Sequence, residues 1–165
     1  PVSAREQPAA PRPAPAVMDA LASGDENFKF RQYRTAINAY GKAARLDEKV
    51  AALNPVQRAI LYERMGTSYN RLGLAKEAVL PLQRSVQAMP NNAAAHYQLA
   101  LACSLDGRFM QALGALQATF ASAPSKGELR KYLILAKSDP ELDPVRDLPG
   151  FRGLVGRYAD PLARR

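Results

Sequence analysis

Two side chains of this sequence have the types that nucleophilic chemistry uses, Cys103 and His96, each the only residue of its kind among 165. A thiol becomes a strong nucleophile when a base such as an imidazole lies within hydrogen-bond reach and takes its proton. Seven positions separate the two residues, which on one helix is about two turns, or ~10 Å along the axis. That is too far for a direct hydrogen bond, so we expect Cys103 to be a buried, inert thiol, His96 to be structural, and the chain to be no enzyme.

Metal and cofactor chemistry is not indicated by the residue pattern either. A metal site or a Ser-His-Asp triad would have to be built around the single histidine, and the sequence holds no HExxH, CxxC, Walker-type or GxGxxG motif. We therefore expect no catalytic residues, no metal site and no cofactor. The single cysteine also excludes a disulfide within the chain.

The chain carries a net charge of +8, spread along its length without a block of five or more basic residues. Such a surface favours acidic partners, whether protein, anionic lipid or nucleic acid, without choosing among them. The aromatic residues could also form a base-stacking platform for nucleic acid. Most of them fall on the packing positions described below, and Tyr97 is the exception.

The elements that must position these side chains are helices. Ala, Leu, Gln, Arg and Lys dominate the composition while Val and Ile are scarce, which predicts an all-α fold. A chain of this length fits one domain. No run of about 18 apolar residues is present that could span a membrane.

Residues 1–16 are rich in proline and alanine, and we expect them to form an extended, disordered tether. Because the sequence begins at Pro1 without a methionine, a signal peptide, a membrane anchor or an artificial boundary is expected upstream. This tether favours a periplasmic or membrane-tethered location over the cytoplasm.

From residue 17 onward, small, apolar and helix-breaking residues recur with a spacing of 34. The matched pairs are Gly66 with Ala100, Tyr69 with Cys103, Gly73 with Gly107, Ala78 with Ala112, Leu82 with Leu116, and Pro90 with Pro124. Each repeat is predicted to be two antiparallel helices. A small residue lies where the helices cross, a glycine ends the first helix, and a proline follows the second.

These positions resemble the tetratricopeptide repeat family, in a bacterial type with an end-of-array capping segment. The resemblance implies a short right-handed α-solenoid of about three helix-turn-helix units. Residues 59–92 and 93–126 match the pattern well, whereas the first unit, 17–58, is degenerate, with Arg31 where a glycine is expected. Residues 127–165 are expected to form a capping helix and a turn-rich segment that covers the end of the array, with a short helix around 151–158. The residues expected to provide this cover are Leu142, Val145, Leu148, Phe151, Leu154 and Val155.

Eight extra residues separate the first and second units, because Ala36 and Ala78 are 42 positions apart instead of 34. The stretch 46–54 is the expected location. Asn54 followed by Pro55 has the pattern of a helix N-cap and a first helical position. Part of the extra length is therefore expected to lengthen the following helix by about two turns.

In the family, ligands usually lie along the concave face, which is formed by the first helix of each repeat. The resemblance implies the following partner-binding residues in a groove of this chain: Asp25, Lys29, Glu63, Arg64, Thr67, Asn70, Arg71, Tyr97, Gln98, Leu101 and Ser104.

Family members that bind a C-terminal carboxylate use a Lys-Asn pair in the first helix, and here Leu21 and Asp25 stand at those positions. The carboxylate grip is therefore absent. The groove instead combines Arg64 and Arg71 with Tyr97, which suits an extended or helical peptide with apolar anchors and some acidic character.

Taken together, the pattern predicts a non-enzymatic scaffold or adaptor that binds a protein or peptide partner. Its composition is typical of bacteria, and assembly, secretion or envelope work is the expected setting. Nucleic-acid binding, or a regulatory role within a larger protein, is the alternative. Self-association also stays open, because repeat arrays can stack end to end.

Overall fold

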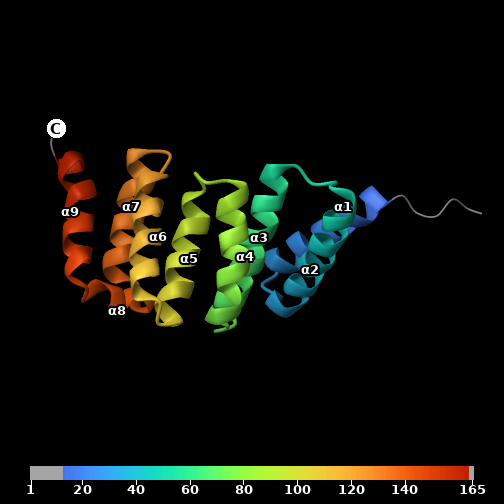
Figure 1. The fold of residues 1–165 in the computed structure, drawn as a ribbon, viewed down its shortest axis with the longest axis horizontal. Coiled ribbons are helices and arrows are strands. Elements are labelled where there is room, and N and C mark those ends of the chain that lie inside the picture. Colours follow the sequence, from blue (N-terminus) through green and yellow to red (C-terminus); the bar gives the residue numbers. More distant parts are fainter. Residues whose placement is uncertain (1–12, 164–165) are drawn as a thin grey trace, which may run out of the picture.

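A computed structural model describes residues 13–163, and in that range the chain is helical without strands. Figure 1 shows the helices standing side by side along one long axis. The elements are α1 (Pro13–Lys29), α2 (Tyr33–Val50), α3 (Pro55–Arg71), α4 (Ala75–Ala88), α5 (Ala93–Leu105), α6 (Phe109–Ala121), α7 (Lys126–Ser138), the 3-10 turn η1 (Pro140–Leu142), α8 (Asp143–Arg146) and α9 (Pro149–Ala163).

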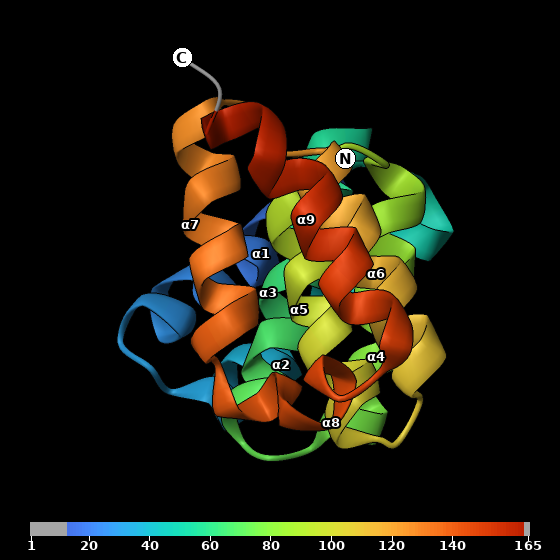
Figure 2. The same ribbon diagram turned by 90° about the vertical axis from the view of Figure 1, so that its left-hand side faces the viewer.

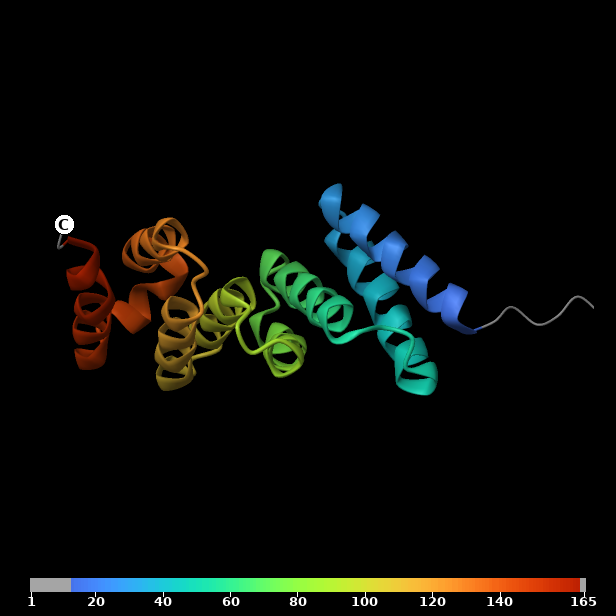
Figure 3. The same cartoon turned by 90° about the horizontal axis from the view of Figure 1, so that it is seen from above.

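The helices form two layers, as an α-solenoid requires. Seen from above, α1, α3, α5 and α7 lie on one side, and α2, α4, α6 and α9 lie on the other (Figure 3). Consecutive helices pack as antiparallel pairs, α1 with α2, α3 with α4 and α5 with α6. Figure 3 also shows the first pair along more of its length than the pairs that follow, so it is inclined to them.

Small residues occupy the positions where the two helices of a pair cross, as the repeat pattern predicts. A Cβ atom on Gly24 would lie 2.5 Å from the Tyr40 ring, and one on Gly66 would lie 2.3 Å from Leu82. Tyr40 and Leu82 are fully buried. The missing side chains therefore allow the large partners to fill the space between the helices.

The turn that joins the helices of each pair needs a residue with positive φ. Gly73 and Gly107 supply it at 73° and 76°, a region that glycine enters without strain. The first pair has Arg31 at φ 59° instead. The first unit therefore makes the same turn with a non-glycine residue in the left-handed region, where side chains with a Cβ atom are disfavoured.

The extra residues between the first two units are shared by two helices. α2 has 18 residues against 14 in α4, and α3 has 17 against 13 in α5. The expectation that the following helix is about two turns longer was wrong, since α2 and α3 are each longer by about one turn. The predicted start of α3 is confirmed: the Asn54 side chain accepts from Gln57 N, the Gln57 side chain accepts from Asn54 N, and Pro55 is in the first turn.

The N-terminal boundary lies earlier than the composition suggested. α1 begins at Pro13, inside the range 1–16 that we expected to be a tether. Proline is well tolerated in the first turn of a helix, and the alanines that follow favour helix formation. The rest of the expected tether, residues 1–12, lies outside the described residues.

The buried apolar residues form two clusters. One is made by α1, α2 and the first half of α3, and the other extends from α4 to α9. The residues expected to cover the end of the array are buried in the second cluster, with Leu148 half-buried: Leu142, Val145, Leu148, Phe151, Leu154 and Val155. α9 is longer than the short helix expected around 151–158, and Figure 2 shows it beside α7 across the end of the array.

Candidate functional site

A cavity of about 410 Å³ lies on the concave side of the array, between α3, α5 and α7. Six residues of the predicted groove line it: Glu63, Thr67, Arg71, Tyr97, Gln98 and Leu101. They come from two consecutive repeats, and the solenoid places them on neighbouring helices of the same layer. The lining also includes residues that the repeat mapping did not identify: Phe28, Ala94, Lys131, Tyr132, Leu135, Asp139 and Glu141.

The C-terminal wall of the cavity consists of the tyrosine pair Tyr97 and Tyr132, whose ring centroids are 5.5 Å apart. Tyr97 is 6% exposed, and its hydroxyl donates to Asp139 Oδ2 at 2.8 Å. Burial raises the pKa of Tyr97, and the hydrogen bond to Asp139 raises it further. Tyr97 is thus a neutral, fixed wall of the groove.

The turn after α7 closes the C-terminal end of the groove. Ser104 Oγ donates to the Glu141 carbonyl at 2.6 Å, and Arg146 donates to the Asp139 carbonyl at 2.7 Å. Ser104 is only 2% exposed. It belongs to the predicted groove, yet its hydroxyl serves to hold the turn of η1 in place. Because these contacts join segments far apart in the sequence, the repeat pattern alone did not reveal them.

Carboxylates are concentrated at this end of the cavity. Glu63 Oε2 accepts from Asn92 at 2.8 Å, and Asp139 Oδ1 accepts from the backbone N–H of Glu141. Burial raises the pKa of Glu141, and the neighbouring negative charge of Asp139 adds to that shift. The positive charge of Arg71 acts in the opposite direction. The site therefore holds acidic groups close to aromatic and aliphatic side chains.

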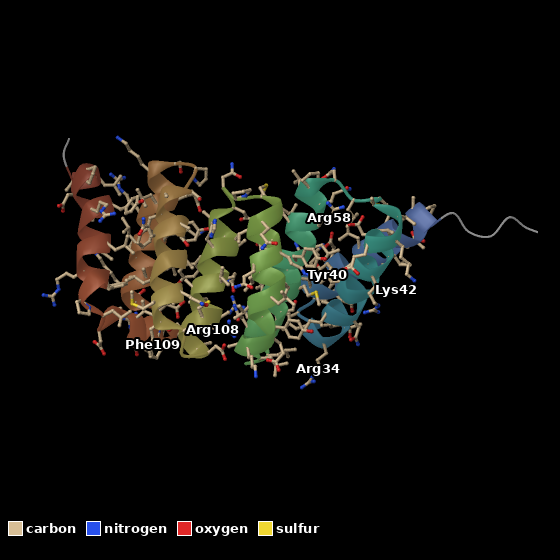
Figure 4. All side chains as sticks on the ribbon, viewed as in Figure 1. Arg34, Tyr40, Lys42, Arg58, Arg108 and Phe109 are labelled. Carbon is tan, nitrogen blue, oxygen red and sulfur yellow. The ribbon has the colours of Figure 1, made fainter. Side chains whose placement is uncertain are left out.

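Asp25 and Arg64, both predicted groove residues, are paired with each other. The Arg64 guanidinium lies 2.6 Å from Asp25 Oδ1, and the Tyr40 hydroxyl donates to the same oxygen at 2.8 Å. Arg64 also lies over the Phe28 ring, 5.7 Å from its centroid. Figure 4 shows Tyr40 where the first helix pair meets α3. These groups connect the first unit to the second.

Two further hollows flank this ion pair. One, of about 620 Å³, includes the predicted residue Lys29 and the exposed ring of Phe30. The other, of about 330 Å³ between α1 and α3, is lined mainly by the apolar side chains of Met18, Leu21 and Ile60. The N-terminal part of the concave face therefore has one apolar hollow and one lined mainly by charged side chains, and the cavity at the C-terminal part is richer in carboxylates.

Asn70 differs from the other predicted groove residues because it is 8% exposed and does not line the cavity. Its Nδ2 donates to the backbone oxygen of Gln98 at 3.0 Å and to the side-chain oxygen of Gln98 at 3.1 Å. Asn70 thus joins α3 to α5 and orients a residue that does line the cavity. Its Oδ1 is buried and has no donor among the described residues.

Cys103 and His96, the two residues whose types could support nucleophilic chemistry, lie in surroundings that are typical of structural residues. Cys103 is buried, and burial raises the pKa of its thiol. His96 Nε2 lies 2.8 Å from the carbonyl of Pro90, near the end of the preceding repeat. Between residues 13 and 163, no three His, Cys, Asp or Glu side chains are grouped as a metal ion would require. In the same range, every helix is too short or too polar to cross a membrane.

Three solved structures with the same architecture are tetratricopeptide repeat domains. The C-terminal domain of a putative FK506-binding protein from Plasmodium falciparum has a TM-score of 0.64 at 16% identity, over 92% of this chain and 94% of that one. The OM64 domain from Arabidopsis gives 0.61 at 16% identity, over 73% and 93%. The TPR2B domain of yeast Sti1, in a complex with pHsp70, gives 0.55 at 18% identity, over 86% and 98%. The chain thus has the tetratricopeptide repeat fold that its sequence resembles.

No family model matches the sequence, and no curated protein matches it.

Proposed function

We propose that this chain is a non-enzymatic scaffold that holds a peptide segment of a partner protein in its concave groove. One observation carries the proposal: residues from two repeats and from the capping helix α7 line a single cavity, with tyrosine and leucine side chains available to an apolar anchor. The tetratricopeptide repeat fold supports a role in protein–protein interaction. A bacterial setting in assembly, secretion or the envelope forms part of the proposal and rests on the composition of the chain.

Site-specific photocrosslinking in cells that make the protein tests this proposal. A photoreactive amino acid replaces Gln98, which lines the cavity, or Gln87, which lies on α4 in the opposite layer. We expect the Gln98 position to form a discrete adduct that the Gln87 position does not form. Identical adducts from both positions, or none from Gln98, would contradict groove binding.

Nucleic-acid binding gains no support from the arrangement of the cations. Several basic side chains are already paired with carboxylates: Arg58, Arg64, Arg84, Arg108, Lys131 and Arg146. Binding through phosphates would give an affinity that falls steeply with salt. We expect no mobility shift with RNA or DNA at low salt, and a salt-sensitive shift would restore this alternative.

A further inference from the structure

Two of the cations near the concave face are paired within the chain, whereas Lys29, which lines the neighbouring hollow, has no ion pair among residues 13–163. Arg64 pairs with Asp25 at 2.6 Å, and Lys131 pairs with Glu128 at 3.1 Å while lying over the Tyr132 ring. Of the cations that line the 410 Å³ cavity, this leaves Arg71, for which no ion pair is found among residues 13–163. The basic character expected of the groove from its sequence is therefore reduced by folding.

The carboxylates that line the cavity are in the opposite situation. Glu63, Asp139 and Glu141 all face it, and none of them has a cationic side chain within ion-pair distance in the described part of the chain. Their hydrogen bonds come from neutral donors, namely Asn92 for Glu63, and Tyr97 and a backbone N–H for Asp139. The lining of the cavity thus contains three carboxylates without an ion pair and one guanidinium without an ion pair among the described residues.

The remaining walls suit the aliphatic and cationic parts of a basic side chain. The Tyr97 and Tyr132 rings meet at an interplanar angle of 43°, which gives the cavity an aromatic wall. Aromatic faces attract ammonium and guanidinium groups. Leu101 and Leu135 offer apolar surface for the methylene stem, which lysine and arginine bury while the charge stays near polar groups.

We propose that the groove recognises a basic peptide segment, in which a lysine or arginine enters the cavity between α3, α5 and α7. An apolar residue of the same segment occupies the hollow formed by Met18, Leu21 and Ile60. This inference rests on the proposed function and names its ligand class. It replaces the partly acidic peptide expected from the sequence with a basic one, because the charge of a groove depends on which cations are already paired.

Selection from a displayed library of random peptides against the full chain tests the inference and the proposed function separately. We expect enriched peptides that share a lysine or arginine close to an apolar residue, with affinity that weakens as salt is added. Enriched peptides that are acidic, or lack a basic residue, would overturn the inference and leave groove binding intact. If no peptide is enriched, both proposals lose their support.

Carboxylate variants then locate the contact. In fluorescence-anisotropy titrations with an enriched peptide, the double variant Glu63→Gln/Glu141→Gln should bind about tenfold more weakly than the unmodified chain. The matched control Glu77→Gln changes an exposed carboxylate on α4 and should bind as tightly as the unmodified chain. A tenfold loss should also follow when the lysine or arginine of the peptide becomes norleucine. Unchanged affinity in the double variant, with unchanged helicity by circular dichroism, would overturn the inference.

Discussion

The junction between the first helix pair and α3 differs from the C-terminal end of the array in the groups that hold it. At the N-terminal junction, charged groups bridge the elements. Asp47, at the end of α2, accepts from the backbone N–H of Leu53 at 2.7 Å and from Arg58 Nε at 2.8 Å. Arg64 and Tyr40 share Asp25 between the first two units.

The C-terminal end relies mainly on apolar side chains. Leu142 and Val145 are fully buried, and Phe151, Leu154 and Val155 are nearly so. The two regions also differ in regularity, since the second and third units follow the 34-residue spacing and the first does not. We infer that the capping segment closes the array through buried apolar side chains, whereas the irregular junction is aligned by directional hydrogen bonds and ion pairs.

The largest effect is expected at the apolar end. Leu142→Ala removes a fully buried side chain and should lower the free energy of unfolding by about 2–5 kcal/mol, through lost transfer energy and the cavity left behind. Urea unfolding followed by circular dichroism measures this loss. Leu80→Ala is the matched control, because Leu80 is 57% exposed and should cost less than about 0.5 kcal/mol. Equal losses in both variants would show that the capping segment adds little to stability.

A smaller effect with a distinct pH dependence is expected at the charged junction. Asp47→Asn should cost about 1.5–3 kcal/mol at pH 7, because it removes a buried charge that is hydrogen-bonded to Arg58. Burial on its own would raise the pKa of Asp47, but the hydrogen bonds from Arg58 and Leu53 lower it overall.

The sign of that shift determines how the difference changes with pH. A carboxylate with a lowered pKa stabilises the fold above its unfolded pKa, and this contribution is lost as the pH falls through the folded pKa. Urea unfolding at pH 7 and at about pH 3 should therefore show the gap between Asp47→Asn and the unmodified chain shrinking in acid. The exposed control Asp19→Asn should stay within about 0.5 kcal/mol at pH 7. A difference in the free energy of unfolding between Asp47→Asn and the unmodified chain that grows in acid would contradict a lowered pKa of Asp47.

The smallest effects on the free energy of unfolding are expected for a tyrosine–aspartate hydrogen bond that occurs at both ends of the array. Tyr40 and Tyr97 each donate a 2.8 Å hydrogen bond to an aspartate, so Tyr40→Phe and Tyr97→Phe should each cost about 0.5–1.5 kcal/mol. Burial and the aspartates raise the pKa of both tyrosines. These tyrosines therefore ionise at a lower pH in the unfolded chain than in the folded chain. The free energy of unfolding should fall above about pH 10, and it should fall less steeply in either variant.

Peptide binding should distinguish these two tyrosines. Tyr97 lines the cavity and Tyr40 does not, so only Tyr97→Phe should change the binding of a groove peptide, measured by fluorescence anisotropy. Phenylalanine keeps the aromatic wall and frees an oxygen of Asp139, so a basic peptide should bind at least as tightly as before. An equal change in both variants would place the ligand across the N-terminal junction as well.

Much of the helical framework could be predicted from the sequence, because it depends on local rules. Gly66, Gly73 and Gly107 occupy the crossing and turn positions that their spacing indicated. The end of α2 could not be predicted in the same way, since no glycine or proline marks it and Ala51 adopts a left-handed conformation there at φ 47°. The division of the extra residues between α2 and α3 followed from that missing stop signal.

The lining of the cavity could be predicted in part from the sequence, but the pairing of its charges could not. Repeat mapping identified Glu63, Tyr97 and Gln98, because their places on the first helix of each repeat determine which way they face. It could not show that Arg64 pairs with Asp25, since that contact depends on how α1 crosses α3. Nor could it show that Asp139 joins the site, because this residue arrives from a turn outside the repeats.

The burial of Cys103 has a practical consequence for measuring motions of this molecule. It is the only cysteine, it is 1% exposed, and its raised thiol pKa keeps it in the unreactive protonated form. A cysteine introduced at an exposed position such as Lys42 on α2 or Gln87 on α4 would therefore take a fluorophore or spin label without removal of the native thiol. Such a pair of labels would report directly on whether the inclined first helix pair moves relative to the second unit when a ligand arrives.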